Sequence, residues 1–189
     1  MLTYAELLKN RRSIREYQDR KIGSEVLQEI LNDTCQAPSA MGLQPWEFIV
    51  IQDKKLMEKI SDESKKNLLC GIEADPNSKL KKYENMLRGS ANVFYNAPCL
   101  VVMVGKNESE FFQRDCALAA AYFMFAATAR NLGTCWIGLG AKIEDASLKK
   151  EIGLPEDYEI AVTLIVGYPQ KIPAASLRQP KILKMMLND

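Results

Sequence analysis

Apolar residues recur at helical spacing in several segments of the chain, and the first such segment lies at its start. Thr3 and Glu6 form a capping box, so a short helix is expected to run from there to about Asn10. Ser24 opens a second expected helix, whose apolar residues repeat every three or four positions until it ends near Cys35.

Helical patterns also cover later parts of the chain. A polar amphipathic helix is expected over residues 53–67, and residues 79–95 have a helical pattern that is interrupted at Gly89. A longer helix is expected over about residues 109–131, with Gly133 well placed to cap its end.

Three apolar runs predict strands, at residues 46–51, 99–104 and 160–166, and the first of them is expected to be buried. A short helix is expected over residues 147–152. Runs of helix with interspersed strands favour the α+β class over a regular alternation of strand and helix. Because no repeat or linker divides the sequence, residues 1–189 are interpreted as one domain.

Residues 117–129 are apolar around nearly the whole circumference of the expected helix. A surface helix carries one apolar stripe, so this helix should be covered on all sides, either as a central helix or at a dimer interface. The run is too short to span a bilayer, which takes about 20 residues.

The absence of histidine excludes many kinds of active site. Ser-His-Asp and Cys-His catalysis, HExxH zinc proteases and His-ligated haem or copper sites all need an imidazole. The formal net charge of +1 gives no general attraction for nucleic acid or an anionic membrane, so neither partner is expected.

The cysteines indicate no metal site and no redox motif. None of them forms a CxxC pair, and the five are Cys35, Cys70, Cys99, Cys116 and Cys135. Reduced thiols in a cytoplasmic protein are the favoured interpretation, with Cys135 as a structural residue. The first residues also lack the basic and apolar pattern of a signal peptide, which again favours the cytoplasm.

Arginines near the N-terminus form the first candidate binding site. Arg11, Arg12 and Arg15 accompany Ser13 within five positions, and guanidinium groups bind phosphate or carboxylate in a forked geometry. Arg178 in the basic tail could complete such an anion site. A solvated basic patch and a solvated tail are the alternatives.

Two further segments are candidates for contact with a ligand. Residues 37–45 form a loop with two prolines and no charged residue, which suggests burial against a ligand or a second subunit, or a core-lining position. Residues 133–140 contain three glycines but match neither GxGxxG nor a P-loop. These glycines allow either a close approach of the backbone to a flat ring or a tight turn.

Taken together, these segments resemble the FMN-dependent nitroreductase family. The matching blocks, in the family's order and spacing, are RRSIR at 11–15, APSxxxxQPW at 37–46, LGTCWIG at 132–138 and VGYP at 166–169, followed by Arg178. The resemblance implies an α+β fold with a mixed or antiparallel sheet flanked by helices. It also implies an intertwined homodimer with two FMN sites at the subunit interface.

The resemblance assigns roles to particular residues. It implies that Arg11, Arg12 and Ser13 hold the phosphate and ribityl chain, with Arg178 as a second phosphate-binding arginine. It places Arg15 beside the pyrimidine end of the flavin ring. The backbone amides that approach the ring nitrogens, including N5, are implied to come from Ile137, Gly138 and Leu139. The resemblance also implies that the partner chain lines the flavin ring, through its residues Pro38, Ser39, Ala40 and Met41.

The implied activity is electron transfer from NADH or NADPH through flavin N5 to nitroaromatic or quinone-like acceptors by a ping-pong mechanism. Because the cofactor carries this chemistry, no catalytic side chain and no metal are expected. Gly42 stands where the family usually has asparagine, so the substrate range stays open. The alternatives are dehydrogenation, dehalogenation or flavin breakdown on the same fold, and a non-catalytic protein that binds FMN or another phosphorylated ligand.

Overall fold

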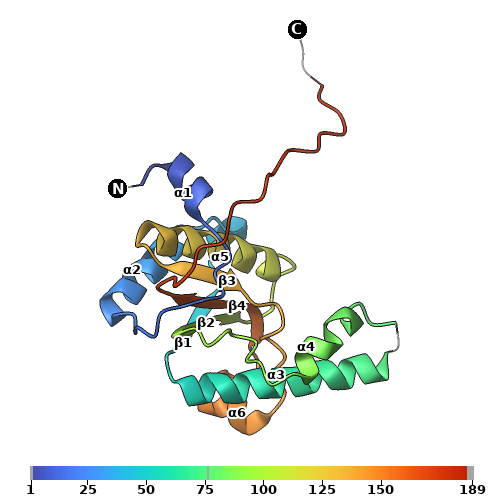
Figure 1. The fold of residues 1–189 in the computed structure, drawn as a ribbon. Helices are drawn as coiled ribbons and strands as arrows, with labels where there is room; N and C mark the ends of the chain where they lie inside the picture. The colour runs from blue at the N-terminus through green and yellow to red at the C-terminus, as the bar shows by residue number, and fades with distance from the viewer. Residues whose placement is uncertain (1, 76, 187–189) are drawn as a thin grey trace.

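An antiparallel four-stranded sheet lies at the centre of the computed structural model, which describes residues 2–75 and 77–186 (Figure 1). The strand order across the sheet is β1-β2-β4-β3. The strands are β1 (Glu47–Ile51), β2 (Cys99–Gly105), β3 (Gly133–Trp136) and β4 (Glu159–Gly167). All three expected strands are present, and the glycine-containing segment after residue 132 supplies the additional strand β3 at one edge of the sheet.

Six α-helices accompany the sheet in the described part of the chain. They are α1 (Tyr4–Asn10), α2 (Ser24–Thr34), α3 (Lys54–Ala74), α4 (Glu84–Arg88), α5 (Phe112–Ala129) and α6 (Ala146–Glu151). Short 3-10 helices occupy η1 (Ala40–Gly42) and η2 (Lys81–Tyr83). The capping box predicted for α1 is present, since Thr3 Oγ1 accepts from the Glu6 N–H and the Glu6 carboxylate accepts from the Thr3 N–H.

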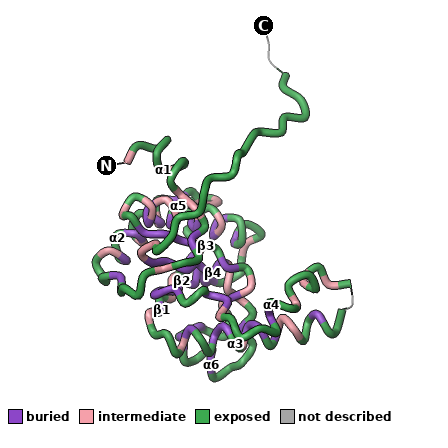
Figure 2. The backbone as a smooth tube through the Cα atoms, in the orientation of Figure 1, coloured by how far each residue is buried: buried purple, intermediate pink, exposed green. Residues whose placement is uncertain are grey.

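The helices form layers on both faces of the sheet (Figure 1). Along β2, Val101 and Met103 belong to the apolar core shared with α2 and α5. Leu100 and Val102 belong to the opposite core, which α3 and α6 cover. This alternation follows from the period of two along a strand, and it explains why the central strand β2 is buried along its whole length (Figure 2).

The segment that follows α1 extends the sheet beyond β3. The Ile14 N–H donates to the Thr134 carbonyl at 2.9 Å, and Ser13 forms a parallel bridge with Thr134. Farther along, the Gln18 N–H donates to the Tyr168 carbonyl at 2.9 Å. The N-terminal segment therefore runs beside β3 and beside the chain that leaves β4, which brings distant parts of the sequence together.

Several sequence predictions need correction at element boundaries. The helix expected over 53–67 continues to Ala74, and the one expected over 79–95 ends at Arg88. Asn131, with φ of 59°, takes the left-handed position after α5 that was assigned to Gly133. Gly133 instead begins β3, where a Cβ atom would lie 2.8 Å from the Ile14 Cβ.

Two more expectations about burial are wrong for the single chain. Strand β1 forms an edge of the sheet and is only partly buried, because among the described residues it pairs with β2 on one side alone. Helix α5 leaves Leu118 and Tyr122 more than 40% exposed, so it is not a central helix of the single chain, and its coverage at a dimer interface stays a prediction. None of the helices in residues 2–75 and 77–186 has the length and apolar character needed to cross a membrane.

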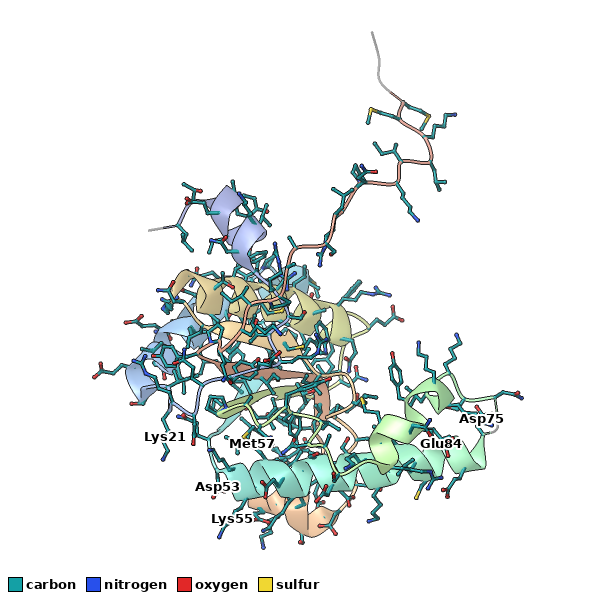
Figure 3. All side chains as sticks on the ribbon, in the orientation of Figure 1. Lys21, Asp53, Lys55, Met57, Asp75 and Glu84 are labelled. Atoms are coloured by element: carbon teal, nitrogen blue, oxygen red, sulfur yellow. The ribbon has the colours of Figure 1, made fainter. Side chains whose placement is uncertain are left out.

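Two parts of the chain extend away from the central body. The C-terminal half of α3 projects beyond the sheet, and α4 lies beside it, with Asp75 and Glu84 at the outer end of this arm (Figure 3). Residues 170–186 form an extended, exposed tail that starts beside α1 (Figures 1 and 2). Both extensions border the cavities described below.

Gly105 at the end of β2 provides a test of the packing. A Cβ atom there would overlap the Pro45 carbonyl oxygen and lie 2.8 Å from the Phe112 ring. We expect Gly105→Ala to lower the free energy of unfolding by about 1–3 kcal/mol, measured by urea denaturation, because main-chain atoms would have to move. Gly71→Ala is the control: with nothing within 4 Å, it should raise the stability of α3 by about 0.5–1 kcal/mol. Equal effects of the two substitutions would contradict this packing.

Candidate functional site

The first part of the candidate site is a small cavity of about 170 Å³ that is lined by three arginines. Arg11 and Arg12 follow the end of α1, and Arg178 approaches from the tail, with Ser176 beside it. None of the three guanidinium groups makes an ion pair with a carboxylate in the described part of the chain. The structure brings Arg178 to the same cavity as Arg11 and Arg12, and the binding of a phosphate by them stays a prediction.

The positive charge of this cavity is not balanced by an ion pair with any of the described residues. Burial, and then the charges of Arg178 and Arg12, lower the pKa of Arg11. Like charges that converge on one cavity repel each other, and a bound anion removes this repulsion while accepting several N–H donors. Phosphate, with its three or four oxygens, matches this arrangement of forked donors.

The second part is a cavity of about 430 Å³ at the end of β3. Arg15 borders it on one side, and Trp136 with the turn Ile137, Gly138 and Leu139 borders it on another. Its remaining wall comes from the arm and the chain that follows it, namely Leu80, Tyr83, Met86, Ala91, Asn92, Val93 and Tyr95. Aromatic and apolar side chains dominate this lining, and such surfaces suit a flat ring.

The turn at the end of β3 leaves two backbone donors free. The Ile137 N–H donates to the Thr163 carbonyl at 2.9 Å, and the Gly140 N–H donates to the Ile137 carbonyl at 3.2 Å. Between them, the N–H groups of Gly138 and Leu139 have no acceptor among residues 2–75 and 77–186. A Cβ atom at Gly138 would meet nothing within 4 Å, so the space beside this turn is open. The turn therefore offers two adjacent donors to a ligand.

Ser13 and Cys135 lie between the two cavities. The Cys135 side chain is buried, with Ser13, Arg15 and Arg11 around it. Burial raises the pKa of the Cys135 thiol, and the two arginines and the hydrogen bond with Ser13 oppose this shift only in part. The group is a neutral thiol near pH 7, in keeping with the structural role expected for it.

The loop residues Pro38, Ser39, Ala40 and Met41 lie outside both cavities of this chain. The Ala40 N–H donates to both carboxylate oxygens of Asp115 at 3.2 Å, which ties the loop to the start of α5. The Gln44 N–H donates to Ser39 Oγ at 2.9 Å. Met41 is 90% exposed, with φ of 50°. Within one chain, the loop does not meet the other predicted site residues.

Sequence reasoning did not identify the wall opposite the turn. Tyr95 and Asn92 belong to a segment predicted as helix, and Tyr95 has a left-handed backbone, with φ of 53°. Nothing in the local pattern indicates this conformation. Trp136 could have been predicted as a site residue, because it lies in the block at 132–138 and places an aromatic side chain beside a glycine-containing turn.

A larger cavity of about 560 Å³ lies between α1, the end of α5 and the first residues of the tail. It shares only Arg12 with the predicted site. Apolar residues and backbone make up most of its surface, and it has no cluster of charges comparable with the arginine cavity.

Comparison with known proteins agrees with this geometry. The model of the nitroreductase family matches residues 8–168. The chain belongs to this family. The matched residues include the arginine segment and all four strands, and the nitroreductase fold is what the sequence resemblance implied.

This member of the nitroreductase family is similar to proteins with more than one named activity. It is 28% identical over 166 residues to an Archaeoglobus fulgidus protein named "Putative NADH dehydrogenase/NAD(P)H nitroreductase", covering 87% of this chain and 84% of that protein. It is 24% identical over 169 residues to the iodotyrosine deiodinase of Thermotoga neapolitana, covering 87% of each.

The fold of this nitroreductase-family chain matches that of a solved structure along its entire length. The crystal structure of a nitroreductase with bound FMN from Bacteroides fragilis superposes with a TM-score of 0.82 at 22% identity, and the match covers 100% of both chains. The prediction of an α+β fold with an antiparallel sheet flanked by helices is confirmed.

Proposed function

We propose that this nitroreductase-family protein is an FMN-dependent oxidoreductase that transfers electrons from NADH or NADPH to a nitroaromatic or quinone-like acceptor. One observation carries the proposal: the short segment from Arg11 to Arg15 joins a cavity lined by three arginines to one with a largely aromatic and apolar lining. A phosphate at one end and a planar ring at the other are the features of FMN. The FMN-bound Bacteroides fragilis relative supports this assignment.

The chain's residues fit the two ends of this cofactor. Arg11, Arg12 and Arg178 would hold the phosphate, because their three guanidinium groups have no carboxylate partner of their own among the described residues. The free N–H groups of Gly138 and Leu139 would donate to acceptor nitrogens of the ring. Ser13, between the two cavities, would bond the ribityl chain.

Arg15 would supply a permanent positive charge beside the ring. Its guanidinium lies 5.6 Å from the centre of the Tyr95 ring, which holds it at the wall of the cavity at the end of β3. A fixed cation in a largely apolar cavity stabilises negative charge that develops nearby. We expect Arg15→Ala to weaken FMN binding and to slow flavin reduction for this reason.

When bound, FMN accepts and donates hydride at N5 and so supplies the redox chemistry. The chain's own residues would bind and orient the ring, and the side chains of Tyr83, Met86 and Trp136 would lie against it. A nicotinamide and an acceptor would occupy this space in turn, which is the basis of a ping-pong sequence. No side chain with acid or base chemistry is required at the ring.

A second copy of the chain would complete the site. Met41 is 90% exposed, and the face of α5 that carries Phe111, Leu118 and Tyr122 is more than 40% exposed at each of these residues. In a homodimer that covers α5, the loop at 38–41 would contribute the remaining wall beside the partner's flavin. A cytoplasmic location stays a prediction from the sequence.

Reductive dehalogenation is the second candidate function. The relation to the Thermotoga neapolitana iodotyrosine deiodinase favours it, and the aromatic lining of the cavity at the end of β3 by Tyr83, Tyr95 and Trp136 suits a phenolic ring as well. The two candidate functions share the cofactor site and differ in the acceptor.

Anaerobic titration of the purified protein tests the proposed function. We expect a yellow protein whose absorption near 450 nm disappears when NADH or NADPH is added and returns on addition of menadione or a nitrobenzoate. Return of colour with 3-iodotyrosine, but with neither of the other acceptors, would favour dehalogenation. A colourless protein that takes up no added FMN would contradict both functions.

Arg178→Ala tests the phosphate site. We expect the dissociation constant of FMN to rise about tenfold to a hundredfold, because a charge-assisted hydrogen bond is lost, while the affinity for riboflavin, which lacks the phosphate, stays unchanged. Quenching of flavin fluorescence measures both constants. Lys181→Ala, a tail cation outside the cavity, is the control and should leave FMN affinity within twofold of the wild type. An equal loss of FMN and riboflavin affinity in Arg178→Ala would argue against a phosphate at this position.

A further inference from the structure

Helix α3 carries polar residues on the face that it turns toward the core. Ser61, Ser64 and Lys65 share one side of the helix by their spacing, and they are 1%, 0% and 9% exposed. Polar residues, lysine above all, are seldom buried unless their groups are hydrogen-bonded. The hydrogen-bond partners of these three side chains are backbone groups of two loops outside the helix. The partners therefore show which parts of the chain the three side chains hold.

Ser64 holds the turn that follows β3. Its Oγ donates to the Leu139 carbonyl at 2.8 Å and accepts from the Lys142 N–H at 3.0 Å. Asn67, one turn later on α3, donates from Nδ2 to the Lys142 carbonyl at 3.0 Å. One hydroxyl thus fixes both ends of the segment that includes Leu139, a residue that lines the cavity at the end of β3 and whose own N–H is one of the two free donors.

Lys65 holds the opposite wall of the same cavity. Its Nζ donates to the Gly89 carbonyl at 2.6 Å and to the Ala91 carbonyl at 3.3 Å, with the Asp62 carboxylate at 3.9 Å. The ammonium therefore satisfies carbonyls just after α4 ends, where the chain turns to place Ala91 and Asn92 on the cavity wall. Ser61 secures the next residue, since its Oγ accepts from the Val93 N–H at 3.0 Å.

Neither loop has regular secondary structure to hold it in place. Residues 137–142 and 89–93 lie between elements, whereas α3 is a continuous helix of 21 residues, capped at its start by the Asp53 carboxylate. A rigid helix that bonds two irregular loops determines the distance between them. These two loops form facing parts of the wall of the cavity at the end of β3.

We propose that Ser64 and Lys65 are positioning residues, Ser64 for the backbone donors of Gly138 and Leu139, and Lys65 for the wall of the acceptor space at residues 89–93. This inference rests on the proposed function for the identity of the ligands. The assignment of one loop to each side chain rests on the hydrogen bonds alone. Neither side chain lines the cavity, so both act through the backbone that they hold.

The two substitutions Ser64→Ala and Lys65→Met separate these roles. Amide hydrogen exchange of the protein without added ligand should accelerate about tenfold in residues 137–142 for Ser64→Ala, and in residues 86–95 for Lys65→Met, with the other segment unchanged in each case. Lys66→Met, the same change at the exposed neighbouring lysine, and Thr34→Val, which removes a buried hydroxyl from α2, should alter neither segment. If Ser64→Ala does not fold, Ser64→Cys, with a weaker hydrogen-bonding group of similar size, replaces it.

Ligand binding gives the second measurement on the same variants. Ser64→Ala should raise the dissociation constant of FMN about tenfold and slow flavin reduction by NADH in a single turnover, with an unchanged KM for menadione. Lys65→Met should raise the KM for menadione about fivefold to tenfold and leave FMN affinity within twofold of the wild type.

Exchange that changes equally in both segments, or not at all, would overturn the inference, as would equal losses of FMN affinity in the two variants. Failure of the wild-type protein to bind FMN would instead contradict the proposed function, and the exchange measurement would still decide whether each side chain holds its own loop.

Discussion

The pairing of the N-terminal segment with β3 is the interaction on which the site depends. Two backbone hydrogen bonds, from the Ile14 N–H to Thr134 and from the Gln18 N–H to Tyr168, anchor this segment at both ends. Arg12 and Arg15 lie on either side of the anchored Ile14 in the sequence, and they line separate cavities. Ile14 occupies the space beside Gly133 that a side chain there would fill, which ties the register of the pairing to this glycine.

At the arginine end of this segment, the clustered positive charges lower the stability of the folded chain. Burial, and then the charges of Arg178 and Arg12, lower the pKa of Arg11. The three guanidinium groups, which have no carboxylate partner among the described residues, weaken the folded state through mutual repulsion. A bound phosphate would reverse this effect, since a ligand that binds only the folded state stabilises it. At the other end, α3 supplies the rigidity that the irregular loops lack. In the proposed cofactor site, a bound anion would stabilise the arginine cavity, and hydrogen bonds from α3 fix the walls of the cavity at the end of β3.

Much of the fold could be predicted from the sequence because its signals are local. The capping box of Thr3 and Glu6, the helical spacing in α2 and the apolar run of β2 each depend on neighbouring residues only. The family resemblance then implied the fold that the B. fragilis structure confirms. It also placed Arg178 with the N-terminal arginines, although more than 160 residues separate them, and the structure has these residues at one cavity.

The rest depends on contacts that no local pattern records. The chain from Ala91 to Tyr95 has helical composition, yet the Lys65 ammonium and the Ser61 hydroxyl bind its backbone in a non-helical path. Gly133 was interpreted as a helix cap because its true constraint is distant in the sequence. Ile14, near the N-terminus, packs against this position and leaves no room for a side chain. The position of Met41 relative to the cavities depends, in our proposal, on a second chain, which a single sequence does not describe.

A crystal structure of the protein with FMN would test the central claim most directly. The phosphate should lie in the cavity of Arg11 and Arg178, with N–H···O distances of about 2.7–2.9 Å, and ring nitrogens should accept from the N–H groups of Gly138 or Leu139. A flavin with its phosphate away from these arginines, or with its ring outside the cavity at the end of β3, would contradict the assignment of the segment from Arg11 to Arg15 as the link between the two halves of the site.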